Sequence, residues 1–155
     1  MAGSRIETRV PPLVVLALAA SFVWLAPDIS GAPPLEIPFG GALAAMLAVA
    51  GAALAFVAVA GFRRAGTTVD PRYPDRTNAL VTAGVYAHTR NPMYVGMAML
   101  LAAFAIVRGD LLGLVAVPAF VAYIDRFQIV PEERALQAQF GDAYAEWCRR
   151  VRRWL

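Results

Sequence analysis

The segment from Phe39 to Phe62 carries no charged residue and is rich in alanine and glycine. About 20 consecutive apolar residues are enough for a helix to cross the hydrocarbon core of a bilayer. The segment therefore predicts a transmembrane helix, and its small residues predict close contacts with neighbouring helices. The hydrophobic fraction of the whole chain is 59 %, above the roughly 45–50 % of soluble domains, which also indicates a membrane protein.

A second apolar segment lies near the start of the chain, from Pro11 to Ala26. Arg5 and Arg9 precede it, as the positive residues of a signal peptide would. However, Pro27 and Asp28 follow it, without a small-residue cleavage site. We therefore expect a retained membrane helix, with a loop from 28 to 38 behind it.

Two shorter apolar arms follow, joined by a turn at Arg108–Asp110. Each arm has about 14–16 residues, or roughly 21–24 Å of helix, which just crosses a bilayer. The sequence thus predicts an all-α integral membrane protein with a single domain and about four transmembrane helices. The predicted spans are 10–26, 39–62, 92–107 and 111–126, the last two forming a short helical hairpin.

A C-terminal segment, residues 131–151, has a different pattern. Glu132 and Glu133 follow Pro131, as acids in a first helical turn, where the helix dipole favours them. Apolar residues then recur at three- and four-residue steps, which predicts an amphipathic cytoplasmic helix. They are Leu136, Phe140, Tyr144, Trp147, Val151 and Trp154.

The arginines predict the orientation. They gather at the N-terminus, in the polar segment 63–79 and at the C-terminus, whereas the 28–38 loop has two acids and no base. The positive-inside rule then puts both termini and the 63–79 segment in the cytoplasm. Since the composition suggests a bacterium, the membrane would be the bacterial inner membrane.

Several polar side chains occupy the expected cytoplasmic end of the 92–107 helix, in the stretch AHTRNPMY (87–94). Pro92 suits a first helical position, so Asn91 is a plausible cap. Interfacial roles are open to the others: His88, Arg90 and Tyr94. A second polar group, Asp125, Arg126 and Gln128, ends the next helix, and charged groups at membrane depth are usually functional.

The sequence also excludes some classes of site. It has no Gly-rich phosphate loop and no recognisable Ser-His-acid set. A single histidine and a single cysteine, Cys148, argue against a metal site and an internal disulfide. A net charge of +3 is too small to indicate nucleic-acid binding. A charged cofactor and an amphipathic substrate would suit the remaining polar groups.

Two motifs carry a family resemblance. LVTAGVYAHTRNPMYVG (80–96) and PEERALQAQFGDAYAEW (131–147) resemble the paired signatures of the isoprenylcysteine carboxyl methyltransferase family, which has short bacterial members. The phospholipid N-methyltransferases share the same general plan. The resemblance covers about half of the chain.

This resemblance implies S-adenosylmethionine as the methyl donor, bound between the two motifs. The residues that it assigns to the cofactor are Leu80, Val81, Tyr86, Asn91, Pro92, Tyr94 and Glu132. Arg90 would stabilise the cofactor's carboxylate or a substrate anion. Glu133 or His88 would take the proton from an amine acceptor.

Two positions depart from the eukaryotic pattern. Asn91 stands where those enzymes have histidine, and Gln128 aligns with a substrate-facing arginine. Arg126 is a possible substitute, but a two-residue shift turns a side chain by about 160° around a helix. We therefore do not expect a prenylcysteine carboxylate as the acceptor. The expected acceptor is another lipophilic or amphipathic molecule with a carboxylate, thiol or amine. Three alternatives remain: an NADPH-dependent membrane reductase of the sterol-reductase type, a phospholipid N-methyltransferase and a non-catalytic scaffold.

Overall fold

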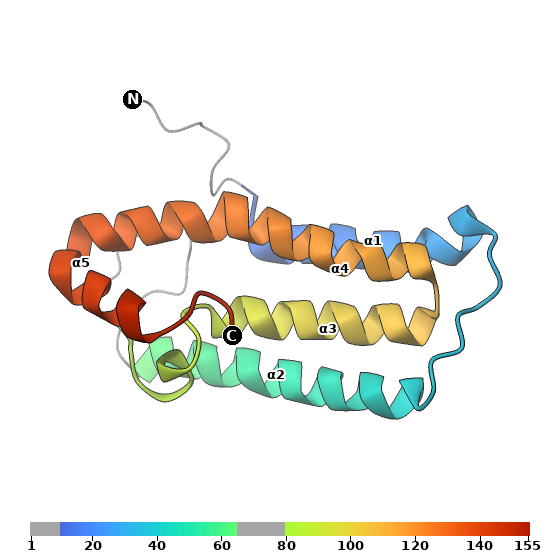
Figure 1. Ribbon diagram of the computed structural model, residues 1–155, viewed down its shortest axis with the longest axis horizontal. Helices are drawn as coiled ribbons and strands as arrows, with labels where there is room; N and C mark the ends of the chain where they lie inside the picture. Colours follow the sequence, from blue (N-terminus) through green and yellow to red (C-terminus); the bar gives the residue numbers. More distant parts are fainter. Residues whose placement is uncertain (1–9, 65–79) are drawn as a thin grey trace.

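The computed structural model describes residues 10–64 and 80–155, and the described part of the chain is helical, without a β-strand. The predicted 63–79 segment falls largely outside these residues. The helices lie side by side in a bundle, with one long helix extending past its end (Figure 1). Their bounds are α1 (Pro12–Ser30), α2 (Gly40–Arg64), the 3-10 turn η2 (Gly84–Ala87), α3 (Pro92–Arg108), α4 (Leu111–Ile124), the π-helical turn η3 (Asp125–Ile129) and α5 (Val130–Arg150).

The predicted fold class, an all-α membrane protein, is confirmed. Within residues 10–64 and 80–155, three helices are long and apolar enough to cross a membrane, namely α1, α2 and the continuous helix from Leu111 to Arg150. The fourth, α3, is a shorter apolar helix of 17 residues. It packs along α2 and also contacts α1 and α4. In Figure 1 it lies between α2 and α4 over most of its length.

The helix α1 continues beyond the end predicted for it. It includes Pro27 and ends at Ser30, so that residues 28–30 are helical and not part of a loop. Gly31 then ends the helix in a left-handed conformation, and its N–H donates to the carbonyl of Pro27. Pro27 has no backbone N–H, so the last turn of α1 lacks one hydrogen bond of the helical ladder.

Small residues bring α2 and α3 close together, as the composition of 39–62 predicts. A Cβ atom on Gly51 would lie 2.8 Å from the carbonyl oxygen of Gly96, and one on Gly96 would lie 2.6 Å from that of Gly51. Both distances are shorter than real contacts allow. The two backbones therefore touch at a point where only glycine fits.

The turn at Arg108–Asp110 joins α3 to α4, as predicted, and holds one end of the bundle together. Asp110 caps α4 by accepting from the N–H of Gly113 at 3.1 Å. It also accepts from the Ser30 hydroxyl at 2.6 Å, which ties the end of α1 to the hairpin. The Ser30 hydrogen bond is the main reason why the pKa of Asp110 is lowered. Nearby, the N–H of Leu35 donates to the carbonyl of Gly109 at 2.6 Å.

The expectation of a separate helix after Pro131 is wrong. The chain runs from α4 through η3 into α5 without leaving helical conformation, so Glu132 and Glu133 do not stand at a free helix N-terminus. The wider π-helical turn directly before Pro131 accommodates a residue that cannot donate a backbone hydrogen bond. The dipole therefore does not explain these two acids.

The amphipathic C-terminal helix is not straight. Gly141 has φ 51° and ψ −122°, and α5 bends there. Its last part turns back toward η2 and the start of α3 (Figure 1). The helix ends at Arg150, and Val151 is extended. Tyr144, Trp147 and Val151 nonetheless become buried with Tyr86 and Ala58 in one apolar cluster.

Candidate active site

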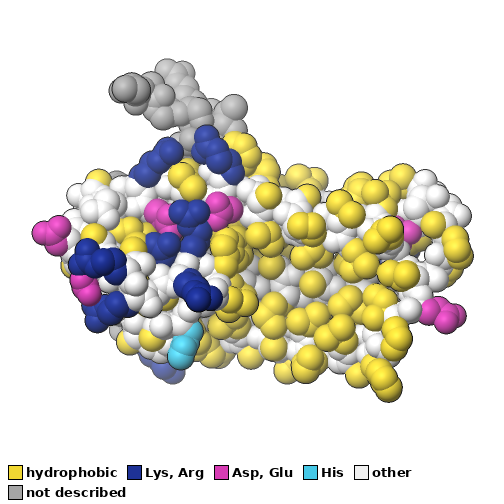
Figure 2. Space-filling model, viewed as in Figure 1, with side chains coloured by type: hydrophobic (Ala, Val, Ile, Leu, Met, Phe, Trp, Pro, Cys, Tyr) yellow, Lys and Arg dark blue, Asp and Glu magenta, His cyan; other side chains and the backbone are white. Residues whose placement is uncertain are grey.

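Charged side chains gather at the end of the bundle where α5 bends, whereas apolar side chains cover most of the remaining visible surface (Figure 2). Two groups of polar residues lie at this end. One is the tyrosine–acid cluster, which comprises Tyr86, Tyr94 and Glu132. The other is the arginine–acid network, which comprises Arg90, Asp125, Glu133 and Arg153.

The tyrosine–acid cluster joins three elements. Tyr94, in the first turn of α3, is buried and donates its hydroxyl to Oε1 of Glu132 on α5 at 2.6 Å. Tyr86, on η2, is also buried and donates to the carbonyl of Ala58 at 3.4 Å. Burial raises the pKa of Tyr86 well above its ordinary value, and the nearby carboxylate of Glu132 adds to the increase. Tyr94 is thus hydrogen-bonded to the half-buried Glu132, and Tyr86 lies close enough to be influenced by the charge of the same carboxylate.

Leu80 and Val81 adjoin this cluster. Both are half-buried and pack against the apolar group that holds Tyr86 and Trp147. The indole N–H of Trp147 donates to the carbonyl of Tyr86 at 3.2 Å, which fixes η2 against the returning part of α5.

The arginine–acid network lies at the same end. NH2 of Arg90 lies 3.1 Å from Oε1 of Glu133, and both side chains are largely buried, with 13 % and 18 % exposed. Arg153 donates to both oxygens of Glu133, from Nε at 3.1 Å and from NH2 at 2.6 Å. Its NH1 lies 3.1 Å from Oδ2 of Asp125. The hydrogen bonds to Glu133 are the main reason why the pKa of Arg153 is raised above its ordinary value.

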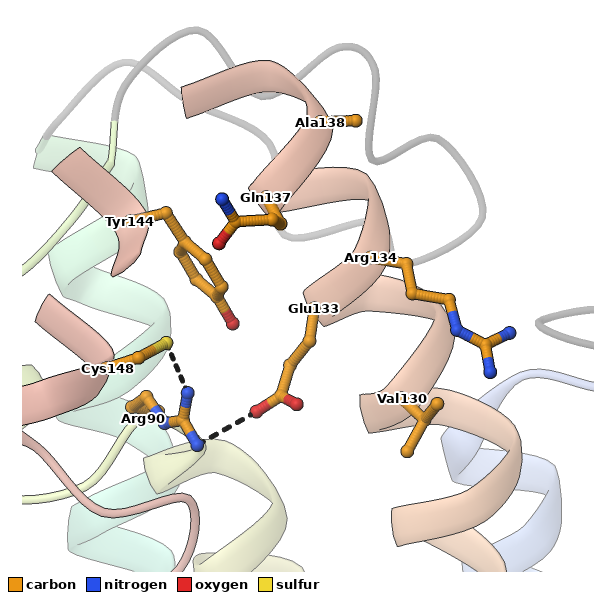
Figure 3. A pocket seen from close by; sticks show the side chains of 8 residues that line it. All are labelled: Arg90, Val130, Glu133, Arg134, Gln137, Ala138, Tyr144 and Cys148. Atoms are coloured by element: carbon orange, nitrogen blue, oxygen red, sulfur yellow. Dashed lines mark hydrogen bonds and ion pairs between the residues drawn. The ribbon is translucent and has the colours of Figure 1, made fainter. Parts of the chain in front are cut away.

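A pocket of about 480 Å³ opens beside this network. Arg90 and Glu133 face one another across its floor, the ring of Tyr144 lies over them, and Arg134 points away (Figure 3). NH1 of Arg90 contacts the sulfur of Cys148, while its buried Nε has no hydrogen-bond partner among the described residues. The lining is completed by Val130, Gln137 and Ala138. The volume is within the roughly 300–1,000 Å³ of small-molecule sites.

Asn91 and Pro92 are at the start of α3, and Pro92 is its first residue, as predicted. The predicted capping role of Asn91 is wrong, because its side chain makes no capping hydrogen bond. Its amide instead donates to the carbonyl of Arg153 at 2.9 Å. The backbone N–H of Asn91 donates to the hydroxyl of Thr89 at 3.2 Å.

Of the predicted site residues, Arg90 and Glu133 line the pocket. Three others lie outside both the pocket lining and the two polar groups. His88 is exposed after η2. Arg126 is exposed on η3, with its guanidinium 5.6 Å from the ring centroid of Phe127. Gln128 is 1 % exposed and donates to the carbonyl of Val10 at 2.8 Å, so that it contacts the start of α1.

Residues 39–143 match the model of the phospholipid methyltransferase family. The chain belongs to the phospholipid methyltransferase family. An uncharacterized protein of Haemophilus influenzae is 38 % identical over 63 residues, which are 41 % of this chain and 100 % of that protein. No solved structure matches the chain. This is a family of membrane methyltransferases. The phospholipid N-methyltransferases were named above, beside the isoprenylcysteine enzymes, as sharing the same general plan.

In this phospholipid methyltransferase family member, the matched range includes the whole tyrosine–acid cluster. It also includes the arginine–acid network except Arg153, which lies beyond its end. No motif distinguished Arg153 from its neighbours in the sequence, because it is one of four arginines from 149 to 153. Arg149 and Arg150 are exposed beside Glu146 on α5. Because the helix ends before it, Arg153 leaves the helical phase and turns inward.

Proposed function

We propose that this protein is a membrane methyltransferase that uses S-adenosylmethionine and transfers a methyl group to a lipophilic or amphipathic acceptor. The observation that supports this most is the tyrosine–acid cluster. Tyr86, Tyr94 and Glu132 come from three elements, and all three are residues that the family resemblance assigns to the cofactor. They meet at the same end of the bundle as a pocket lined by Arg90 and Glu133.

The chemistry of these residues fits the cofactor. Glu132 is a half-buried carboxylate that would hold its α-ammonium group. Arg90 has a buried Nε without a partner among the described residues, and would donate it to the α-carboxylate. Leu80, Val81 and Tyr86 supply an apolar surface for the adenosine. When bound, the cofactor would supply a methyl group already activated on a positively charged sulfur.

The protein's own contribution is then to orient the acceptor and exclude water, which is a proximity effect. Tyr144, Val130 and Ala138 give the pocket an apolar wall. Arg90 and Glu133 fix its polar floor, because both of their side chains are largely buried and paired. A carboxylate or thiolate acceptor needs nothing more.

An amine acceptor would need a base. Glu133 is already paired with two guanidinium groups, those of Arg90 and Arg153, and His88 lies outside the pocket lining. Among the described acids of this end, Asp125 and Glu133 are bound by arginines, whereas Glu132 accepts from Tyr94. Asp125, Glu132 and Glu133 are thus all engaged, so an acceptor that needs no base, a carboxylate or a thiolate, fits this site best.

The acceptor is expected to come from the membrane. The pocket stands at the end of an apolar bundle, where charged residues gather (Figure 2). Arginines of α2, η3 and α5 lie at this end, and the positive-inside rule then assigns it to the cytoplasm. In a bacterium the membrane would be the inner one, and the acceptor a lipid or another lipophilic molecule of its cytoplasmic leaflet.

The test is titration calorimetry with S-adenosylmethionine on the purified protein in detergent. The Glu132→Gln variant keeps the size and loses the charge, so its affinity should fall by about 1.5–3 kcal/mol, the scale of a hydrogen bond to a charged group. Glu146→Gln is the matched control, because Glu146 is an acid of α5 that pairs only with surface arginines. Equal affinity in both variants would reject the role of Glu132.

Two further results would decide the function. Binding of NADPH without binding of S-adenosylmethionine would favour the reductase alternative. Incubation of native membranes with methyl-labelled S-adenosylmethionine, followed by extraction of lipid, small-molecule and protein fractions, would identify the class of acceptor. We expect the label in the lipid fraction, and the loss of that label when the gene is deleted.

A further inference from the structure

The last residues of the chain, Val151–Leu155, form a C-terminal tail that lies across the start of α3. Three donors from the segment before α3 bind its backbone. The N–H of Arg90 donates to the carbonyl of Arg152 at 2.9 Å. The amide of Asn91 and the hydroxyl of Thr89 donate to the carbonyl of Arg153, at 2.9 and 3.3 Å. The tail is therefore fixed against the segment that carries Arg90.

The side chains of the tail reach two other elements. Arg153 donates hydrogen bonds to Glu133 of α5 from Nε and NH2. Its NH1 forms an ion pair with Asp125 of η3. The indole N–H of Trp154 donates to Oδ1 of the same Asp125 at 3.0 Å. The tail thus connects α3, η3 and α5 at the end of the bundle where the pocket lies.

The network is an alternating row of charges. Asp125, Arg153, Glu133 and Arg90 follow one another, and their formal charges cancel. Because Arg153 binds both oxygens of Glu133, that carboxylate is shared between two guanidinium groups. Without Arg153, Glu133 would be free to pair with Arg90 alone, and the row would carry a net negative charge. Both changes would weaken the binding of an anionic group at Arg90.

We infer that Arg153 is a positioning residue of the methyl-transfer site, which acts by holding Glu133 so that Arg90 remains available to an anionic group of the bound ligand. The inference rests on the proposed function, because it takes S-adenosylmethionine as that ligand. It adds the C-terminal tail to the site, although the tail contributes no residue to the pocket lining. Asn91 then acts through the tail, by holding the carbonyl of Arg153.

The test compares Arg153→Gln with Arg152→Gln in the full-length protein. Both variants lose one positive charge from the same tail, but Arg152 is exposed and only Arg153 enters the network. We expect Arg153→Gln to lower the affinity for S-adenosylmethionine at least about tenfold, as for the loss of a hydrogen bond to a charged group. Arg152→Gln should bind like the parent protein. The measurement is calorimetry on folded protein, with thermal unfolding recorded for each variant.

Arg153→Lys provides a second measurement. Lysine keeps the charge, but it lacks the planar guanidinium that binds both oxygens of a carboxylate at once. We expect this variant to fold and to bind S-adenosylmethionine with an affinity between those of Arg153→Gln and the parent. If Arg153→Gln does not fold, the comparison of Arg153→Lys with the parent tests the inference. A purely structural role would lower the melting temperature and leave the affinity of the folded protein unchanged.

The possible failures are distinguishable. Equal affinity in Arg153→Lys, Arg152→Gln and the parent would overturn the positioning role and leave the proposed function intact. Equal affinity in Arg153→Gln and Arg152→Gln would do the same. A parent protein that does not bind S-adenosylmethionine would reject the proposed function, and with it the role of Arg153.

Discussion

A single carboxylate, Asp110, connects stability to pH. Its side chain is buried and accepts from the hydroxyl of Ser30 and the N–H of Gly113. These hydrogen bonds favour the charged form and lower its pKa below the ordinary value of 3.8. A lowered folded-state pKa gives a stabilisation that is present above the unfolded-state pKa and is lost as the pH falls through the folded-state pKa.

We therefore expect the difference in melting temperature between the parent and Asp110→Asn to be constant near neutral pH and to shrink below about pH 4. Asparagine still caps a helix, so the variant should fold. The measurement is thermal unfolding in detergent from pH 7 to pH 3. A difference that does not change with pH would mean that the charge of Asp110 contributes nothing to stability.

At the residue scale, the sequence predicted where residues stand in their helices better than which residues their side chains contact. It located Asn91 and Pro92 correctly at a helix start, because proline at the first helical position is a local signal. It did not predict that the amide of Asn91 binds Arg153, which is 62 residues away in the chain. Partners of this kind depend on where the chain returns, and no local pattern encodes that.

The pair of helices α2 and α3 gives a test at the scale of elements. A methyl group on Gly96 would meet the backbone of Gly51 and the side chain of Ala55. Gly96→Ala should therefore destabilise the protein by about 1–3 kcal/mol, the usual cost of overpacking. Gly41→Ala is the control, because a methyl group on this exposed glycine of α2 meets nothing within 4 Å. Thermal unfolding of both variants measures the effect, and equal melting temperatures would refute the close contact.

Hydrophobic periodicity located the helices but not the shape of the last one. The apolar runs of α1, α2 and α4 are long enough to be read without knowledge of the neighbours. The bend of α5 depends on Gly141, whose positive φ a pattern of apolar steps does not reveal. The same pattern would fit a straight helix, in which Trp147 could not reach Tyr86 by turning back.

At the scale of the whole molecule, the two ends of the bundle have different chemistry. The start of α1 and the C-terminal tail both contact η3, through Gln128 and Asp125. The opposite end holds the 31–39 loop and the α3–α4 turn, which meet where Leu35 donates to Gly109. Arg108 is the arginine of the described residues at that opposite end, and its guanidinium lies 4.5 Å from the ring centroid of Trp24.

This arrangement predicts the topology in the membrane. Because the start of α1 and the C-terminal tail lie at the same end of the bundle, the chain should cross the bilayer an even number of times. The arginines of that end should face the cytoplasm. Reporter fusions after Trp154 and within Ile29–Pro34 should therefore report opposite compartments, with the Trp154 fusion in the cytoplasm. Two reporters on the same side would exclude the four-crossing arrangement, and exchanged sides would place the pocket and its cofactor site away from the cytoplasm.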